Sequence, residues 1–143
     1  MNVASILKVK GKLVATAPSE DTVETVAQKL ASKKIGAIVI VNEGGDVAGI
    51  ISERDIIRVI AEQGSAALRQ PVSTVMTKNV MTCNEANTID QMMSIMTQGR
   101  FRHVPVIEEG SLVGIISIGD VVKHHIAEVE MEVTAMRDYL ATG

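Results

Sequence analysis

Aromatic residues are almost absent from this chain of 143 residues, which has one phenylalanine (Phe101), one tyrosine (Tyr139) and no tryptophan. Its core must therefore be built from aliphatic side chains and from the eight methionines, whose flexible thioethers pack adaptably. Cys83 is the single cysteine, which excludes an internal disulfide and leaves no cysteine-based zinc signature.

Excess positive charge and long apolar runs are missing as well. A net charge of -3 argues against nucleic acid or an anionic membrane surface as the main partner. No apolar run approaches the roughly 20 residues needed to span a bilayer, and the N-terminus lacks the charged and apolar regions of a signal peptide. We therefore expect a cytoplasmic protein with neither a nucleic acid nor a membrane as its partner.

Two seven-residue segments that lie 65 residues apart reveal an internal repeat. They are Gly49-Ile50-Ile51-Ser52-Glu53-Arg54-Asp55 and Gly114-Ile115-Ile116-Ser117-Ile118-Gly119-Asp120. The similarity extends to residues 14–44 and 80–110 at a shift of 66. Because residues 3–7 also resemble residues 72–76, each copy is predicted to begin with a short lead-in helix.

Each copy contains the same predicted order of elements. Apolar residues recur at helical spacing in residues 22–34 and 88–99, where Thr22 and Thr88 are placed to cap the helices. Short apolar runs predict two strands in each copy, at residues 37–41 and 47–52 and at residues 103–107 and 112–117.

The second strand of each copy runs directly into another helix, from Glu53 to about Gln63 and from Ile118 onward. With a brief strand near Val14 or Val80, the half-unit is β-α-β-β-α. A unit of about 50 residues would leave one apolar face of its sheet exposed if it stood alone. We therefore predict an α+β fold in which two repeats pack sheet to sheet with pseudo-two-fold symmetry.

The predicted boundaries follow from this repeat. Residues 1–66 form the first repeat with its lead-in helix, residues 67–127 form the second repeat, and residues 128–143 extend the C-terminal helix. Apolar residues recur along this last helix at steps of three and four, at positions 118, 122, 126, 129, 133, 136 and 140. A narrow apolar seam of that length favours packing against a second chain over packing against a small, complete core. The alternative is a helix folded back over its own module.

The paired Ser-x-x-Asp segments have a chemical interpretation of their own. Ser52 and Ser117 stand where a strand turns into a helix, so their hydroxyls and the first free backbone N–H groups favour an anion such as phosphate. Asp55 and Asp120 follow three residues later and could accept hydrogen bonds from ribose hydroxyls. The same pattern is also a capping box, which satisfies helix N-terminal donors and binds nothing. Both interpretations remain open.

The order of elements, the doubled Gly-hydrophobic-hydrophobic-Ser-x-x-Asp motif and the segment Arg102-His103-Val104-Pro105-Val106 resemble a tandem cystathionine-beta-synthase (CBS) domain pair. Such a pair is called a Bateman module, and this chain resembles the stand-alone bacterial type. The resemblance covers Met1 to about Ala127. It implies a regulatory module in signal transduction, without a catalytic cofactor, that binds an adenosine-containing ligand between the repeats.

The resemblance also implies two unequal clefts, each drawing on both copies. The pocket around Asp55 would use Ile50, Ser52, Arg54, Thr77, Phe101 and Arg102. The pocket around Asp120 would use Ile115, Ser117 and Gly119 with Arg102 and His103 near phosphate, and Ile35, Gly36 and Ala37 from the first copy. Arginine offers a rigid fork for phosphate oxygens, and histidine offers a donor or a pH-dependent charge. Alternatively, Arg102 is a solvated charge at a strand edge and His103 a structural residue.

These basic residues favour phosphate-bearing ligands over the cationic sulfonium of S-adenosylmethionine. AMP and NAD(H) rank first, ATP or ADP next, and S-adenosylmethionine after them. Family members commonly pair as homodimers, so a homodimer is expected. Since the chain shows no effector domain, the output would pass to a separate effector protein.

The sequence leaves two other classes of function open. One is a protein-interaction module that keeps the fold without binding a ligand. The other is an enzyme related to inosine monophosphate dehydrogenase, but the large barrel of that enzyme has no counterpart here. Cys83 has no nearby general base in the sequence to make it a nucleophile. Adjacent His124 and His125 point in different directions on a helix, so no metal site is expected.

Overall fold

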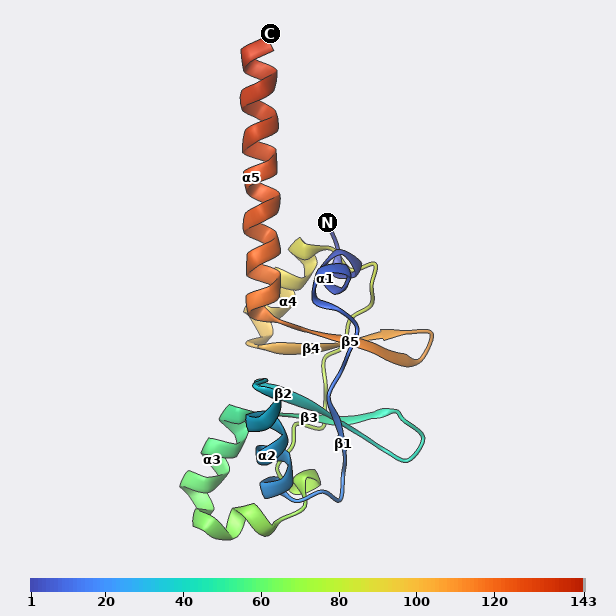
Figure 1. The fold of residues 1–143 in the computed structure, drawn as a ribbon, viewed down its shortest axis with the longest axis vertical. Coiled ribbons are helices and arrows are strands. Elements are labelled where there is room, and N and C mark those ends of the chain that lie inside the picture. The colour runs from blue at the N-terminus through green and yellow to red at the C-terminus, as the bar shows by residue number, and fades with distance from the viewer. Residues whose placement is uncertain (143) are drawn as a thin grey trace.

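The computed structural model describes residues 1–142, and two sheets face each other across the middle of the molecule with helices on their outer sides (Figure 1). The first repeat consists of β1 Thr16–Pro18, α2 Val23–Lys33, β2 Ala37–Val41, β3 Val47–Ser52 and α3 Glu53–Gln63. The second repeat consists of α4 Ile89–Gly99, β4 His103–Glu108, β5 Ser111–Ser117 and α5 Ile118–Thr142. The predicted α+β fold of two repeats packed sheet to sheet, with a long C-terminal helix, is confirmed.

Local signals account for the positions of the helices. Thr22 caps α2 by accepting a hydrogen bond from the backbone N–H of Thr25, and Thr88 forms a capping box with Gln91 at the start of α4. At the other end, Lys34 and Arg100 occupy equivalent positions in the repeat and both adopt the left-handed conformation, with φ of 54° and 56°. Equivalent residues thus begin and end the equivalent helices.

The two sheets differ in their outer strand. In the first, β1 runs parallel to β2, and β2 runs antiparallel to β3. In the second, β4 and β5 are antiparallel, and the strand expected near Val80 is reduced to one parallel bridge between Cys83 and Val106. Its backbone bonds run from Cys83 N to Pro105 O at 3.0 Å and from Ile107 N to Cys83 O at 2.8 Å.

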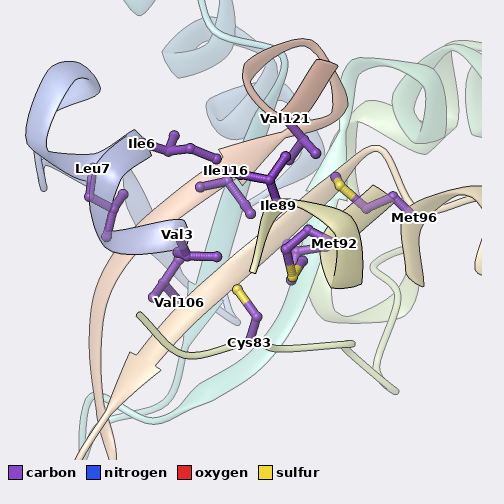
Figure 2. Packing of buried hydrophobic residues seen from close by; sticks show 11 residues of the cluster. Val3, Ile6, Leu7, Cys83, Ile89, Met92, Met96, Val106, Ile116 and Val121 are labelled. Carbon is purple, nitrogen blue, oxygen red and sulfur yellow. The ribbon is translucent and has the colours of Figure 1, made fainter. Parts of the chain in front are cut away.

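The lead-in segments are exchanged between the repeats. Helix α1, Val3–Lys10, places Val3, Ile6 and Leu7 in the core of the second repeat, together with residues of α4, β4 and β5 (Figure 2). The equivalent residues 72–76 contain the short 3-10 helix η2 Val72–Thr74 instead of a longer helix, and the connection before them forms the 3-10 helix η1 Gly64–Arg69. Val72 of the lead-in segment and Ala67 of the connection both lie in the core of the first repeat. Each repeat is therefore completed by the lead-in segment of the other.

The first glycine of each repeated motif makes room for this exchange. A Cβ atom on Gly114 would lie 2.7 Å from Cδ2 of Leu7, and a Cβ atom on Gly49 would lie 2.8 Å from the carbonyl oxygen of Thr77 and overlap Met76. Leu7 and Met76 are equivalent residues of the two lead-in segments. Close approach of the opposite lead-in segment, rather than an unusual backbone angle, explains why glycine stands at both positions.

Helix α5 extends far beyond the body of the molecule (Figure 1). Its residues from Met131 to Thr142 are all exposed, so it does not fold back over its own module. Within residues 1–142, no helix is both long enough and apolar enough to cross a bilayer.

Candidate functional site

Two cavities lie where the repeats meet, and both draw on residues of both repeats. The larger, of about 510 Å³, is lined by Lys10, Leu13, Val14, Ala15, Lys33, Ile35, Gly36, Ala37, His103, Ile115 and Ser117. The smaller, of about 250 Å³, is lined by Ala37, Ile50, Ser52, Arg54, Asp55, Arg58, Thr77, Arg100, Phe101, Arg102 and His103. Ala37 and His103 line both cavities and thus stand between them.

Strand register builds the two cavities symmetrically. Ala37 at the start of β2 is paired with Ser52 at the end of β3, and His103 at the start of β4 is paired with Ser117 at the end of β5. The same backbone bond then closes each strand-to-helix turn, from Glu53 N to Gly36 O at 3.0 Å and from Ile118 N to Arg102 O at 2.8 Å. Each serine consequently sits at the first turn of a helix, at the edge of a cavity.

Both Ser-x-x-Asp segments form the capping boxes that the sequence left as an alternative. Ser52 N donates to Asp55 Oδ2 at 2.9 Å, and Asp55 N donates to Ser52 Oγ at 3.3 Å. Ser117 N donates to Asp120 Oδ2 at 2.8 Å, and Asp120 N donates to Ser117 Oγ at 3.1 Å. Capping occupies only Oδ2 of each carboxylate, so it does not by itself exclude a ligand.

The second oxygen distinguishes the two carboxylates. Oδ1 of Asp55 accepts a hydrogen bond from Nη2 of Arg58 at 2.9 Å, and the Asp55 side chain is only 15% exposed. Lys10 instead approaches the oxygen of Asp120 that is already used for capping, with Nζ 2.6 Å from Oδ2. Within the described part of the chain, Oδ1 of Asp120 has no hydrogen-bond partner. Among residues 1–142, Asp120 therefore keeps one oxygen without a partner, which a ligand hydroxyl can use, whereas both oxygens of Asp55 already accept hydrogen bonds.

Burial and neighbouring groups shift the pKa of Asp120 in opposite directions. Burial by itself raises the pKa of Asp120, but the hydrogen bonds from Lys10 and Ser117 and the nearby Lys10 charge outweigh it. The net effect is a pKa below the ordinary value of 3.8. Asp120 is thus a carboxylate, and therefore purely a hydrogen-bond acceptor, at neutral pH.

His103 sits in a very different environment, on the wall shared by the two cavities. Burial is the main reason why its pKa is lowered below 6.5, and Lys10 and Arg102 lower it further, while Asp120 and Glu53 act to raise it. The ring packs against Gly36, where a Cβ atom would lie 3.4 Å from Nε2. His103 is accordingly neutral at pH 7 and offers one N–H donor and one acceptor nitrogen.

The lowered pKa of His103 predicts how stability changes with pH. In the unfolded chain His103 takes up a proton near pH 6.5, whereas in the folded chain it does so at lower pH. The unfolded state therefore binds more protons in the window just below pH 6.5, and the free energy of unfolding falls as pH decreases through it. Urea unfolding from pH 7.5 to 5.0 should show this loss, and His103→Gln should reduce it. Equal pH dependence in both proteins would contradict the assigned environment of His103.

The smaller cavity is dominated by arginine. Its four arginines are Arg54, Arg58, Arg100 and Arg102. Thr77 reaches the same cavity because it pairs with Ile50 at the edge of β3, with Ile50 N to Thr77 O at 3.0 Å and Thr77 N to Ile50 O at 2.9 Å. Because Asp55 is already bound to Arg58 and to its own helix, this cavity suits a phosphate group better than a ribose.

Most of the predicted site residues gather at these cavities. All seven residues predicted around Asp55, including Asp55 itself, line the smaller one. Around the larger one lie Ile35, Gly36, Ala37, His103, Ile115 and Ser117. Arg102 does not: it lines the smaller cavity alone, whereas His103 lines both cavities. Gly119 and Asp120 lie beside the larger cavity, next to Ser117, without lining it.

Sequence reasoning missed four basic residues, Lys10, Lys33, Arg58 and Arg100. Arg58 could have been found, because it stands three residues after Asp55 on a helix and can form an ion pair with it. Lys10 could not, because only the exchange of lead-in segments brings the end of α1 to Asp120.

Other chemistries find little support in the described residues. Among residues 1–142, no group of three or more His, Cys, Asp and Glu side chains is placed to hold a metal ion. Burial raises the pKa of the Cys83 thiol to about 12, so it is not a thiolate at neutral pH. Cys83 belongs to the core of the second repeat, away from both cavities.

Comparison with protein families identifies the repeated unit. The CBS domain matches this chain twice, at residues 11–62 and 72–126. A curated relative, the mitochondrial CBS domain-containing protein CBSX3 from Arabidopsis thaliana, is 32% identical over an alignment of 149 positions, which covers 99% of this chain and 72% of that protein.

Solved structures share the whole architecture. The CBS-domain containing protein ATU1752 from Agrobacterium tumefaciens is 50% identical, with a TM-score of 0.85 over 87% of this chain and 99% of that one. The CBS domain pair of protein MJ0100 in complex with 5'-methylthioadenosine and S-adenosyl-L-methionine is 27% identical, with a TM-score of 0.79 over 90% and 98% of the two chains. Protein PAE2072 from Pyrobaculum aerophilum complexed with AMP is 25% identical, with a TM-score of 0.75 over 84% and 89%.

Proposed function

Because the chain belongs to the CBS domain family and carries two CBS domains in tandem, we propose that it is a regulatory module that binds an adenosine-containing ligand between its repeats. One observation carries the proposal. The larger cavity has room for a nucleoside, and it adjoins a carboxylate, Asp120, that keeps one oxygen free for a ribose hydroxyl. The bound AMP, 5'-methylthioadenosine and S-adenosylmethionine of the similar structures share an adenosine group, which supports this class of ligand.

The charges around the cavities favour ligands that contain phosphate. Lys10 and Lys33 line the larger cavity together with the neutral His103, which offers an N–H donor, and the four arginines line the smaller one. A nucleoside in the larger cavity could direct its phosphate toward the shared wall at His103. A second phosphate, as in ADP or NAD(H), would then come close to the arginines. We rank AMP and NAD(H) first, then ADP and ATP, and S-adenosylmethionine last because its sulfonium is cationic.

The proposed mechanism is a shift in population. A ligand that touches both repeats stabilises the arrangement that it binds best, by no more than its difference in affinity for the two arrangements. The output would be a change in a homodimer or in contact with a separate effector protein, without catalysis. The high pKa of Cys83 is consistent with a non-catalytic role. Localisation in the cytoplasm stays a prediction.

A module that binds only proteins is the second candidate. Lys10 forms an ion pair with Asp120, and both Ser-x-x-Asp segments form capping boxes within the protein. These groups thus have partners within the protein, as expected of an interaction module that had lost its ligand.

Calorimetric titration separates the two candidates. Dialysed protein would be titrated with AMP, NAD⁺, NADH, ATP, GMP and S-adenosylmethionine, and compared with an Asp55→Ala, Asp120→Ala double variant whose folding is checked by circular dichroism. Saturable binding of an adenine nucleotide that the folded double variant loses is the expected result. An absence of heat at several temperatures, with no ligand-induced change in melting temperature, would leave the interaction module.

A further inference from the structure

Helix α5 carries an apolar seam that the described residues leave uncovered. The seam consists of Val122, Ile126, Val129, Val133, Met136 and Leu140. All six side chains are exposed, by 37% to 69%, although each is a large apolar group. Six such groups in one line are unusual on a protein surface and indicate a missing partner.

The spacing of the seam is that of a coiled coil. Successive members are four, three, four, three and four residues apart, which is the alternation of a heptad repeat. Ile126, Val133 and Leu140 take the a positions, and Val122, Val129 and Met136 take the d positions. Since α5 projects from the body of the molecule, a second helix can lie along it (Figure 1).

Charges beside the seam select one orientation of the two helices. In a parallel pair, a g residue faces the e residue five positions later in the other helix. Glu132 then faces Arg137 of the partner subunit, which is a favourable contact. Both side chains are exposed, and neither forms a salt bridge within the described part of its own chain.

An antiparallel pair brings like charges together. With the a and d layers fully overlapped, e residues face e residues and g residues face g residues. Glu130 would then face Glu130 of the partner subunit, Glu132 would face Glu132 of the partner subunit, and Lys123 would face Arg137 of the partner subunit. Like charges across such an interface are unfavourable, so the antiparallel arrangement is disfavoured at each of these pairs.

We infer that α5 forms a parallel, in-register, two-stranded coiled coil with a second copy of this chain. The inference deepens the homodimer part of the proposed function and is independent of ligand binding, because neither cavity is lined by residues beyond Ser117. The coiled coil would place both CBS modules at the same end of the assembly. A change in either module could then act on the other through the paired helices.

Two methionines provide a matched test of the seam. Met136 lies at a d position and Met131 at an f position on the opposite face, and their exposed fractions are 60% and 61%. Sedimentation equilibrium of the full chain should show a dimer. Met136→Glu should raise its dissociation constant about tenfold or more by burying a charge in the seam, and Met131→Glu should change it less than about threefold. A monomeric wild type, or equal effects of the two variants, would overturn the inference.

Orientation is tested by charge reversal and by crosslinking. Arg137→Glu should weaken the parallel dimer, because Glu132 then faces a glutamate, and it should strengthen an antiparallel one, where position 137 faces Lys123. Leu140→Cys, near the end of the helix, should form an intermolecular disulfide under mild oxidation only if the helices are parallel and in register. A stronger dimer with Arg137→Glu, or no crosslink in a dimeric Leu140→Cys protein, would refute the parallel arrangement. Calorimetry with AMP on Met136→Glu tests ligand binding separately.

Discussion

Replacing Leu7 by alanine is expected to lower the free energy of unfolding by about 2–5 kcal/mol, the usual range for a buried leucine. Leu7 is only 1% exposed and lies in the core of the second repeat, although it stands near the N-terminus, before the first repeat. Its Cδ2 atom reaches the space that Gly114 leaves open on β5. The shortened side chain would leave a cavity between α1 and β5 that the surrounding strands cannot easily close.

Leu13 is the matched control for this prediction. It is 98% exposed, so Leu13→Ala should change the free energy of unfolding by less than about 0.5 kcal/mol. Urea unfolding of both variants, followed by circular dichroism, gives the comparison. A small effect of Leu7→Ala would mean that α1 does not complete the core of the second repeat, and that the lead-in segments are not exchanged in solution.

Asp120→Ala is expected to weaken the binding of an adenine nucleotide by about 1–3 kcal/mol, which corresponds to roughly 5- to 150-fold in affinity. The reason is Oδ1 of Asp120, which has no hydrogen-bond partner among residues 1–142 and which we propose accepts a ribose hydroxyl beside the larger cavity. Asp55→Ala should have a smaller effect, below about threefold, because both oxygens of Asp55 are already bound within the protein. Isothermal titration with AMP measures both.

A second substitution separates binding from folding at this position. Asp120→Asn keeps an oxygen that can accept the hydrogen bond from Ser117 N, so the cap of α5 is retained while the negative charge is lost. We expect Asp120→Asn to melt close to the wild type and still to lose nucleotide affinity. Unchanged affinity in both Asp120 variants, or a larger loss with Asp55→Ala, would show that the ribose is held elsewhere.

The sequence was sufficient for most of the elements and for their repetition, but not for the strand expected near Val80, which is a single bridge at Cys83. Apolar periodicity and the capping residues Thr22 and Thr88 placed α2 and α4 to within one residue at each end, because these signals act over one or two turns of the chain. Strand β3 and helix α3 were predicted with their observed bounds, since Ser52 marks the junction by capping the helix. The capping threonine and the apolar periodicity occur in both repeats, so each repeat supports the helix predicted in the other.

The same local signals were weaker at the site. They identified the serines and carboxylates, but they could not decide between capping and ligand binding. Capping uses only Oδ2 of each aspartate, and the local sequence does not show what Oδ1 contacts. The family resemblance placed Arg102 beside His103 in the pocket around Asp120, whereas Arg102 lines only the smaller cavity and His103 lines both.

By itself, then, the sequence determined a duplicated α+β unit, the boundaries of its helices and the residue types that face the junction of the repeats. Only the tertiary structure decided that the lead-in segments are exchanged, that Lys10 therefore meets Asp120, and that Asp120 and Asp55 differ in the oxygen they leave free. The physical reason is distance along the chain. Caps and periodicity join residues within about four positions, whereas Lys10 and Asp120 are 110 residues apart and meet only when both cores have formed.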